Sequence, residues 1–124
     1  MIVVDASALL EVLLRTPNAS AIESRLFENR QSLHAAHLLD VEVASALRGD
    51  GRNVAQARPR GRHDFLAFNI RRYDLVLPRA WALRRNVTVF DAVYVSLAEA
   101  LDAPLFRDRR LAGAAGHHAR IELV

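Results

Sequence analysis

Apolar residues along the chain form short segments of two kinds, and their alternation predicts the fold. Ile2 to Val4 is β-branched and contains no polar residue, which is typical of a strand buried on both faces of a parallel sheet. Ala6 to Leu14 instead repeats leucine at helical spacing. By the same criteria, we predict strands at 2–4, 32–36, 72–76, 103–106 and 119–124, and helices at 6–14, 19–29, 37–48, 65–70, 78–85, 90–101 and 109–115.

The order of these segments predicts one α/β domain that spans residues 1–124. Alternating strands and helices favour a three-layer α/β/α fold around a central, mostly parallel sheet of four to five strands, with the last strand at an edge. The chain has 124 residues and is 52% apolar, which is enough for one core. Gly49 to Arg62 lacks an apolar face and predicts a loop or a broken helix. A solvated connector and an RNA-binding segment are its two interpretations.

Composition excludes several classes of protein. The chain has no cysteine, so disulfides and thiolate chemistry are excluded. All 17 basic residues are arginine, which excludes a phosphate-binding P-loop because that loop needs a lysine. The apolar runs are shorter than the roughly 18 residues of a membrane span, so we expect a cytoplasmic protein without a membrane segment.

Four acidic residues stand where predicted elements begin or end. Asp5 and Asp108 follow apolar strands, whereas Glu42 and Asp91 lie on or at the start of helices. Sites in open parallel sheets form beyond the carboxyl ends of the strands, so these acids are expected to converge. Carboxylates held together repel one another unless a cation neutralises them. An oxygen ligand set without cysteine or a chelating histidine pair favours Mg²⁺ or Mn²⁺ over Zn²⁺.

Each acid also has a simpler interpretation. Asp5 and Asp108 can each cap the helix that follows, and Thr88-Val-Phe-Asp91 has the form of a capping box. Glu42 lies in a mostly apolar helix, where a buried unpaired acid is costly. Its alternative is a glutamate at the edge of the buried face, paired with an arginine.

Other polar residues are weaker candidates. Asp40 is two residues from Glu42 and therefore points elsewhere on a helix, which favours a surface role. Glu99 lies two helical turns after Asp91 and is a minor candidate for supporting the site. His117 and His118 are adjacent, which is not a chelating spacing, and are expected in a loop.

Four segments together resemble the PIN domain and, more narrowly, the VapC-type toxins of bacterial toxin–antitoxin pairs. They are MIVVDASALLEVLL, HLLDVEVASALR, TVFDAVYVSLAEALDAPL and RDRRLAGAAG, and they cover nearly the whole chain. The resemblance implies a PIN-like fold. It also implies that the catalytic acids and metal ligands are Asp5, Glu42, Asp91 and Asp108, and Ser7 matches the hydroxyl of the V-D-A-S start of the family.

The resemblance further implies a metal-dependent endoribonuclease toxin that hydrolyses RNA with a metal-activated water. Its expected partners are a cognate VapB-type antitoxin, an RNA of the tRNA or rRNA class, and a second copy of the chain in a homodimer. Three arginines flank the predicted site and are candidates for RNA binding, with solvated charges at a helix start as the alternative. They are Arg107, Arg109 and Arg110.

Two departures from the family pattern define an alternative function. The family usually has a threonine two residues before the last acid, where this chain has Phe106, which is expected to remove a hydroxyl near the pocket and to add bulk there. Gly49 to Arg62 also replaces a regular helix. The alternative is a catalytically weakened PIN-fold module that binds antitoxin or RNA without efficient cleavage. A third hypothesis is a metal-free ribonuclease that uses paired histidines.

Overall fold

The computed structural model describes residues 1–28, 31–49, 69–74, 77–107 and 116–123. Several predictions therefore lie outside the described residues. These are the helix at 109–115, residues 65–68 of the helix at 65–70, nearly all of the segment from Gly49 to Arg62, and the three site candidates Asp108, Arg109 and Arg110.

Five strands form one sheet in the order β3-β2-β1-β4-β5, and every neighbouring pair is parallel. The strands are β1 (Ile2–Val4), β2 (Leu33–Ala36), β3 (Ile70–Tyr73), β4 (Leu105–Arg107) and β5 (Ile121–Leu123). This arrangement confirms the predicted parallel sheet, and β5 lies at an edge as expected. Because β4 returns to the far side of β1, the direction of strand order reverses between these two strands.

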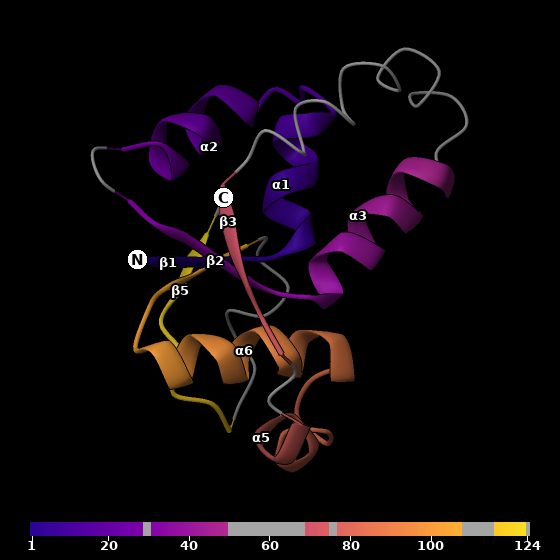
Figure 1. Ribbon diagram of the computed structural model, residues 1–124, viewed down its shortest axis with the longest axis vertical. Helices are drawn as coiled ribbons and strands as arrows, with labels where there is room; N and C mark the ends of the chain where they lie inside the picture. The colour runs from indigo at the N-terminus through magenta and orange to yellow at the C-terminus, as the bar shows by residue number, and fades with distance from the viewer. Residues whose placement is uncertain (29–30, 50–68, 75–76, 108–115, 124) are drawn as a thin grey trace.

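Helices cover both faces of the sheet, which confirms the three-layer fold. They are α1 (Ala6–Leu13), α2 (Ala19–Leu26), α3 (Leu38–Gly49), α5 (Leu77–Ala82) and α6 (Val89–Leu101). Figure 1 shows α1 and α2 on one side of the strands and α6 on the other, with α5 packed on the outside of α6. Helix α3 packs against α1 and β2.

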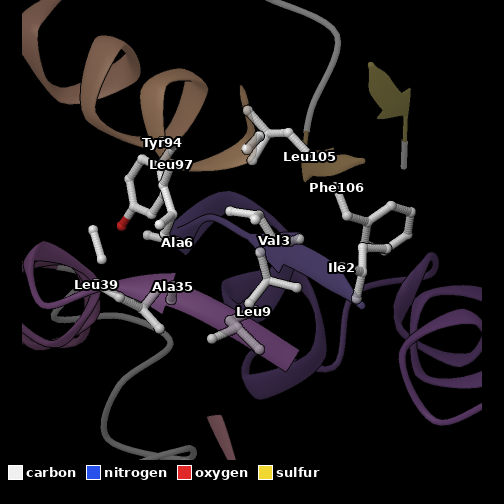
Figure 2. Close-up of a cluster of buried hydrophobic side chains, with 14 of the residues drawn as sticks. Ile2, Val3, Ala6, Leu9, Ala35, Leu39, Tyr94, Leu97, Leu105 and Phe106 are labelled. Carbon is white, nitrogen blue, oxygen red and sulfur yellow. The ribbon is translucent and has the colours of Figure 1, made fainter. Parts of the chain in front are cut away.

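The core fills the space between the layers. The three residues of β1 are completely buried, as the run of β-branched residues predicts. Figure 2 shows Tyr94 and Leu97 of α6 on one side of Val3 and Leu9 of α1 on the other. Apolar burial on both faces of β1 therefore fixes the position of its carboxyl end, where Asp5 follows.

Several predicted boundaries are wrong by two or three residues: α2 ends at Leu26 instead of 29, β3 ends at Tyr73 instead of 76, and β5 begins at Ile121 instead of 119. Strand β3 begins at Ile70 instead of 72, so the predicted helix at 65–70 cannot include that residue. Strand β4 is 105–107 instead of 103–106, because it pairs in register with β1 and β5 only from Leu105 onward. The helix predicted at 78–85 ends at Ala82, where turns begin.

Within the described part of the chain, no helix combines the length and the apolar character that crossing a membrane requires.

Candidate active site

A cavity of about 670 Å³ opens beyond the carboxyl ends of β1 and β4. This is where the strand order reverses, and in open parallel sheets ligands bind at such a point. Residues from α1, α3, α6 and β4 form its wall. They are Asp5, Ala6, Ser7, Leu10, Val41, Glu42, Ser45, Ala46, Thr88, Phe90, Asp91, Tyr94 and Arg107. Three of the four predicted acids thus line one cavity.

Asp5 is both a helix cap and a wall of this cavity. It follows β1 directly and is the N-cap of α1, where its carboxylate accepts a hydrogen bond from the backbone N–H of Ala8 at 3.2 Å. The Ser7 hydroxyl donates to the same oxygen at 2.6 Å. The capping interpretation is therefore confirmed. Capping does not exclude a role in the site, because Asp5 also lines the cavity, although only 4% of the residue is exposed.

Asp91 enters the cavity from the first turn of α6. The Thr88 hydroxyl accepts a hydrogen bond from the Asp91 N–H at 3.1 Å, so Thr88 is the N-cap that the sequence predicts. The Asp91 carboxylate accepts a hydrogen bond at 2.5 Å from Nη1 of Arg107. The cap fixes the backbone of Asp91, and the arginine fixes its carboxylate.

Glu42 reaches the cavity from α3 and has the least compensated charge of the three acids. Its Oε1 is buried and has no hydrogen-bond partner among the described residues. Burial raises the pKa of Glu42, and the nearby Asp91 charge raises it further, whereas Tyr94 and Arg107 act in the opposite direction. The alternative of an edge glutamate near an arginine is correct in part, because Glu42 is half-buried and the Arg107 charge lowers its pKa, but no described arginine donates a hydrogen bond to Oε1.

Arg107 lies beside the acids, as the sequence predicts, but its contact with two of them was not predicted. It is the last residue of β4, and only 5% of it is exposed. Its Nε lies 3.3 Å from Oδ2 of Asp5, and its Nη1 contacts Asp91. The interpretation as a solvated charge is therefore wrong for Arg107. The run RDRR looks solvent-exposed in sequence, and only the alternation of side chains along a buried strand could have suggested otherwise.

Phe106 does not line the cavity, contrary to the expectation that it adds bulk there. Side chains alternate along β4, and Phe106 pairs in register with Val4, so both face away from Val3 and Leu105. Figure 2 shows Phe106 beside Ile2, and only 4% of it is exposed. The residue is part of the core.

The weaker candidates lie outside the cavity. Asp40 binds Arg72 through two hydrogen bonds of 2.7 Å, which confirms a role away from the site. Glu99 binds Arg79 and the backbone of His118. His117 and His118 lie in a loop, as predicted.

The carboxylates of the cavity are suitable ligands for a hard divalent cation, but an arginine side chain lies between two of them. Carboxylate oxygens are the ligands that Mg²⁺ prefers, and the buried Oε1 of Glu42 lacks a partner in the described part of the chain. In the ranges that the structure describes, however, no three acidic or histidine side chains are close enough to share one ion. The guanidinium of Arg107 contacts both Asp5 and Asp91 instead.

Known proteins resemble this chain over nearly its whole length. Ribonuclease VapC12 of Mycobacterium tuberculosis is 42% identical over 130 residues, which cover 100% of this chain and 99% of the relative. Ribonuclease VapC1 of the same species is 41% identical over 98% of this chain and 96% of its own.

Solved structures share the fold. PAE2754 from Pyrobaculum aerophilum aligns with a TM-score of 0.68 and 26% identity over 95% of this chain and 87% of its own. VapC20 of Mycobacterium tuberculosis, a toxin that cleaves the sarcin–ricin loop, aligns with a TM-score of 0.68 and 13% identity over 93% of this chain and 97% of its own. VapBC2 of Rickettsia felis, bound to a DNA fragment of its promoter, aligns with a TM-score of 0.70 and 13% identity over 98% of both chains.

The PIN domain profile matches residues 2–116, a range that contains every residue of the cavity wall. Together with full-length relatives at about two-fifths identity, this match shows that the chain belongs to the PIN domain family, among its VapC-type members.

Proposed function

We propose that this protein is a metal-dependent endoribonuclease toxin of a VapBC-type toxin–antitoxin pair. The observation that carries the proposal is the convergence of Asp5, Glu42 and Asp91 on one cavity at the point where strand order reverses. Relatives named as VapC ribonucleases, at 41% and 42% identity, support RNA as the substrate.

Asp5, Glu42 and Asp91 would hold Mg²⁺ or Mn²⁺, with Asp108 completing the set of acids. When bound, the metal supplies Lewis acidity, which lowers the pKa of a water molecule and stabilises negative charge on the phosphate. Ser7 orients Asp5 by donating to its carboxylate. Thr88 holds the first turn of α6 and so keeps Asp91 directed at the cavity.

The proposal includes the partners of the resemblance: a VapB-type antitoxin, a homodimer, and a tRNA or rRNA substrate in the cytoplasm. Charge supports a polyanionic substrate, since 17 arginines exceed 14 acidic residues and the formal net charge is +3. Binding of RNA is therefore expected to weaken as salt concentration rises. Arg109 and Arg110 remain candidates for this contact.

The weakened PIN-fold module is the less favoured function. Its main support was Phe106, and that residue packs in the core instead of filling the cavity. The three described acids that the family pattern requires are all at the cavity wall.

Replacement of Glu42 by glutamine separates catalysis from stability. We expect Glu42→Gln to abolish RNA cleavage while raising the free energy of unfolding of metal-free protein by about 1 kcal/mol, because it removes the charge of a half-buried carboxylate whose buried Oε1 has no partner among the described residues. Cleavage is measured with Mn²⁺ or Mg²⁺, with and without a chelator, and stability by urea unfolding.

Glu23→Gln is the matched control, because Glu23 is exposed on α2 and should leave both quantities unchanged. The proposal is wrong if wild-type protein cleaves RNA equally well in the presence of the chelator. Products that end in a cyclic phosphate would instead favour the metal-free histidine mechanism.

A further inference from the structure

Arg107 occupies the centre of the acid cavity although it is a charged residue at the end of a buried strand. Its side chain is 6% exposed, equal to the exposure of the Asp5 side chain, and that of Asp91 is 28% exposed. The guanidinium contacts one carboxylate through Nε and the other through Nη1. One cation therefore bridges two acids that come from β1 and α6.

This contact explains how the acids stay together in the absence of metal. Three carboxylates on one cavity repel one another, and the cost is visible in Glu42, whose pKa burial and Asp91 raise while Arg107 lowers it. A buried arginine that forms an ion pair with one carboxylate and a hydrogen bond with the other reduces this repulsion. The fold thus contains a positive charge where the proposed function places a divalent ion.

Arginine and a divalent ion need the same oxygens. Oδ2 of Asp5 and Oδ1 of Asp91 both face the guanidinium, so an ion that binds these two oxygens takes a position next to a like charge and competes with the contacts of Arg107. The charge of Arg107 also reduces the attraction of the cavity for a second cation. Both effects weaken metal binding.

We propose that Arg107 is an internal counter-ion that competes with the divalent metal for Asp5 and Asp91, so that metal binding displaces the guanidinium. The inference rests on the proposed function, since it takes the cavity as a metal site. In the metal-free protein Arg107 is a positioning residue that holds the two carboxylates, and it sets the metal concentration at which the site fills.

The first test measures Mn²⁺ affinity by isothermal titration calorimetry for wild type, Arg107→Gln and Arg79→Gln. We expect Arg107→Gln to bind Mn²⁺ about tenfold more tightly than wild type, because a competing charge is removed. Metal-free Arg107→Gln should have a lower melting temperature than wild type, and its melting temperature should rise more on addition of Mn²⁺. Arg79→Gln is the control: it breaks a bidentate pair with Glu99 on α6, outside the cavity, and should keep wild-type affinity.

A second measurement uses the wild-type protein alone, so it does not depend on how well a variant folds. The Arg107 Nε–H signal is followed by NMR during titration with Mg²⁺. We expect it to shift and to exchange faster with solvent as the ion binds. A signal that stays unchanged while the amides of Asp5 and Ala8 respond to Mg²⁺ would overturn the proposal.

The two proposals fail in different ways. If wild type binds Mn²⁺ and Arg107→Gln binds it no more tightly, or more weakly, Arg107 has a merely structural role and the inference is wrong, whereas the proposed nuclease stands. If none of the three proteins binds Mn²⁺ and cleavage resists chelator, the metal-dependent function fails, and the competition fails with it.

Discussion

Individual side chains in the cavity differ in how their charge is compensated. Asp5 has a hydroxyl, a backbone N–H and Arg107 around it, and Asp91 has the same arginine. Glu42 has an oxygen without a partner among the described residues. The protein therefore pairs two of its acids with one arginine and leaves an oxygen of the third without a described partner, so the three acids are not equivalent in charge.

His34 gives a residue-scale prediction that is independent of the cavity. Its ring bonds to the hydroxyls of Tyr73 and Ser32 at 2.8 and 2.9 Å, and burial lowers its pKa from 6.5, helped by the N-terminal ammonium and Arg71. The unfolded chain therefore takes up a proton more readily than the folded protein. Stability should be complete above pH 6.5 and should fall as the pH drops below it.

Urea unfolding at about pH 7.5 and about pH 5.5 measures this loss, and His34→Gln should reduce it. The matched control is His37→Gln, because His37 is an exposed histidine that follows the same strand and is not part of the hydrogen bonds of His34. If the free energy of unfolding falls equally between the two pH values for wild type and His34→Gln, another group is responsible for the loss.

The sequence predicted the acids of the site better than it predicted their counter-ion. Asp5 follows an uninterrupted apolar run and Glu42 interrupts an apolar helix, so local pattern alone singles out both. The partners of Arg107 lie 16 and 102 positions away in the chain, and no local pattern encodes such a contact. Tertiary structure decides whether an arginine next to other arginines is solvated or buried.

At the scale of elements, ion pairs attach the outer helices to their neighbours. Arg79 of α5 binds Glu99 of α6 at 2.7 and 3.1 Å, and Arg25 of α2 binds Glu122 of β5 at 2.8 Å. Arg72 of β3 binds Asp40 of α3. The Arg79–Glu99 pair connects two consecutive helices, and the other two pairs connect elements that are further apart in the sequence. These contacts specify which surfaces meet after apolar burial has brought the elements together.

Glu99→Gln tests the attachment of α5 and the loop that follows Gly116. The Glu99 carboxylate accepts from Arg79 and from the His118 N–H, and Arg79 lowers its pKa. We expect a loss of about 0.5 to 1 kcal/mol at neutral pH, reduced by solvent screening because Arg79 is partly exposed. The loss should disappear as the pH falls below 4.5 through the folded-state pKa, where wild-type Glu99 also becomes neutral.

Urea unfolding of both proteins measures the difference. Glu28→Gln is the control, because its pair with Arg25 is 3.5 Å long and its side chain is 62% exposed. If Glu28→Gln lost as much stability as Glu99→Gln, the larger contribution that we assign to the less exposed Arg79–Glu99 pair would be wrong.

The type of an element could be predicted where its periodic pattern extends over many residues. Boundaries were wrong where they depend on hydrogen-bond pairing between strands. The four-residue spacing of Val93, Leu97 and Leu101 predicted α6 to within one residue. Strand β3 begins at Ile70 because that residue pairs with Leu33 of β2. A three- or four-residue strand carries too little pattern to fix its own ends.

At the scale of the whole molecule, one sheet holds the site together through its central strands. Leu105 is completely buried in β4, which pairs with β1 on one side and β5 on the other. The same register places Arg107 beside the end of β1. The stability of the central strands and the geometry of the cavity therefore both depend on the packing of β4 against β1.

Leu105→Ala should cost about 3 kcal/mol of unfolding free energy, because it leaves a cavity between the sheet and α6. Leu123→Ala makes the same change at the edge strand, where the side chain is 46% exposed, and should cost less than about 1 kcal/mol. Urea unfolding compares the two variants. Similar losses at both positions would mean that the edge strand is as important to the core as β4.

The pairing of β1 with β4 has a consequence for synthesis of the protein. The Asp5 N–H donates to the carbonyl oxygen of Phe106, so the first strand completes its hydrogen bonds only when the chain around residue 106 is present. A growing polypeptide on the ribosome already carries Asp5, Glu42 and Asp91, yet it lacks β4, the strand whose pairing with β1 fixes the end of β1 at the cavity. We therefore expect translation products that terminate before β4 to be harmless to the cell that makes them.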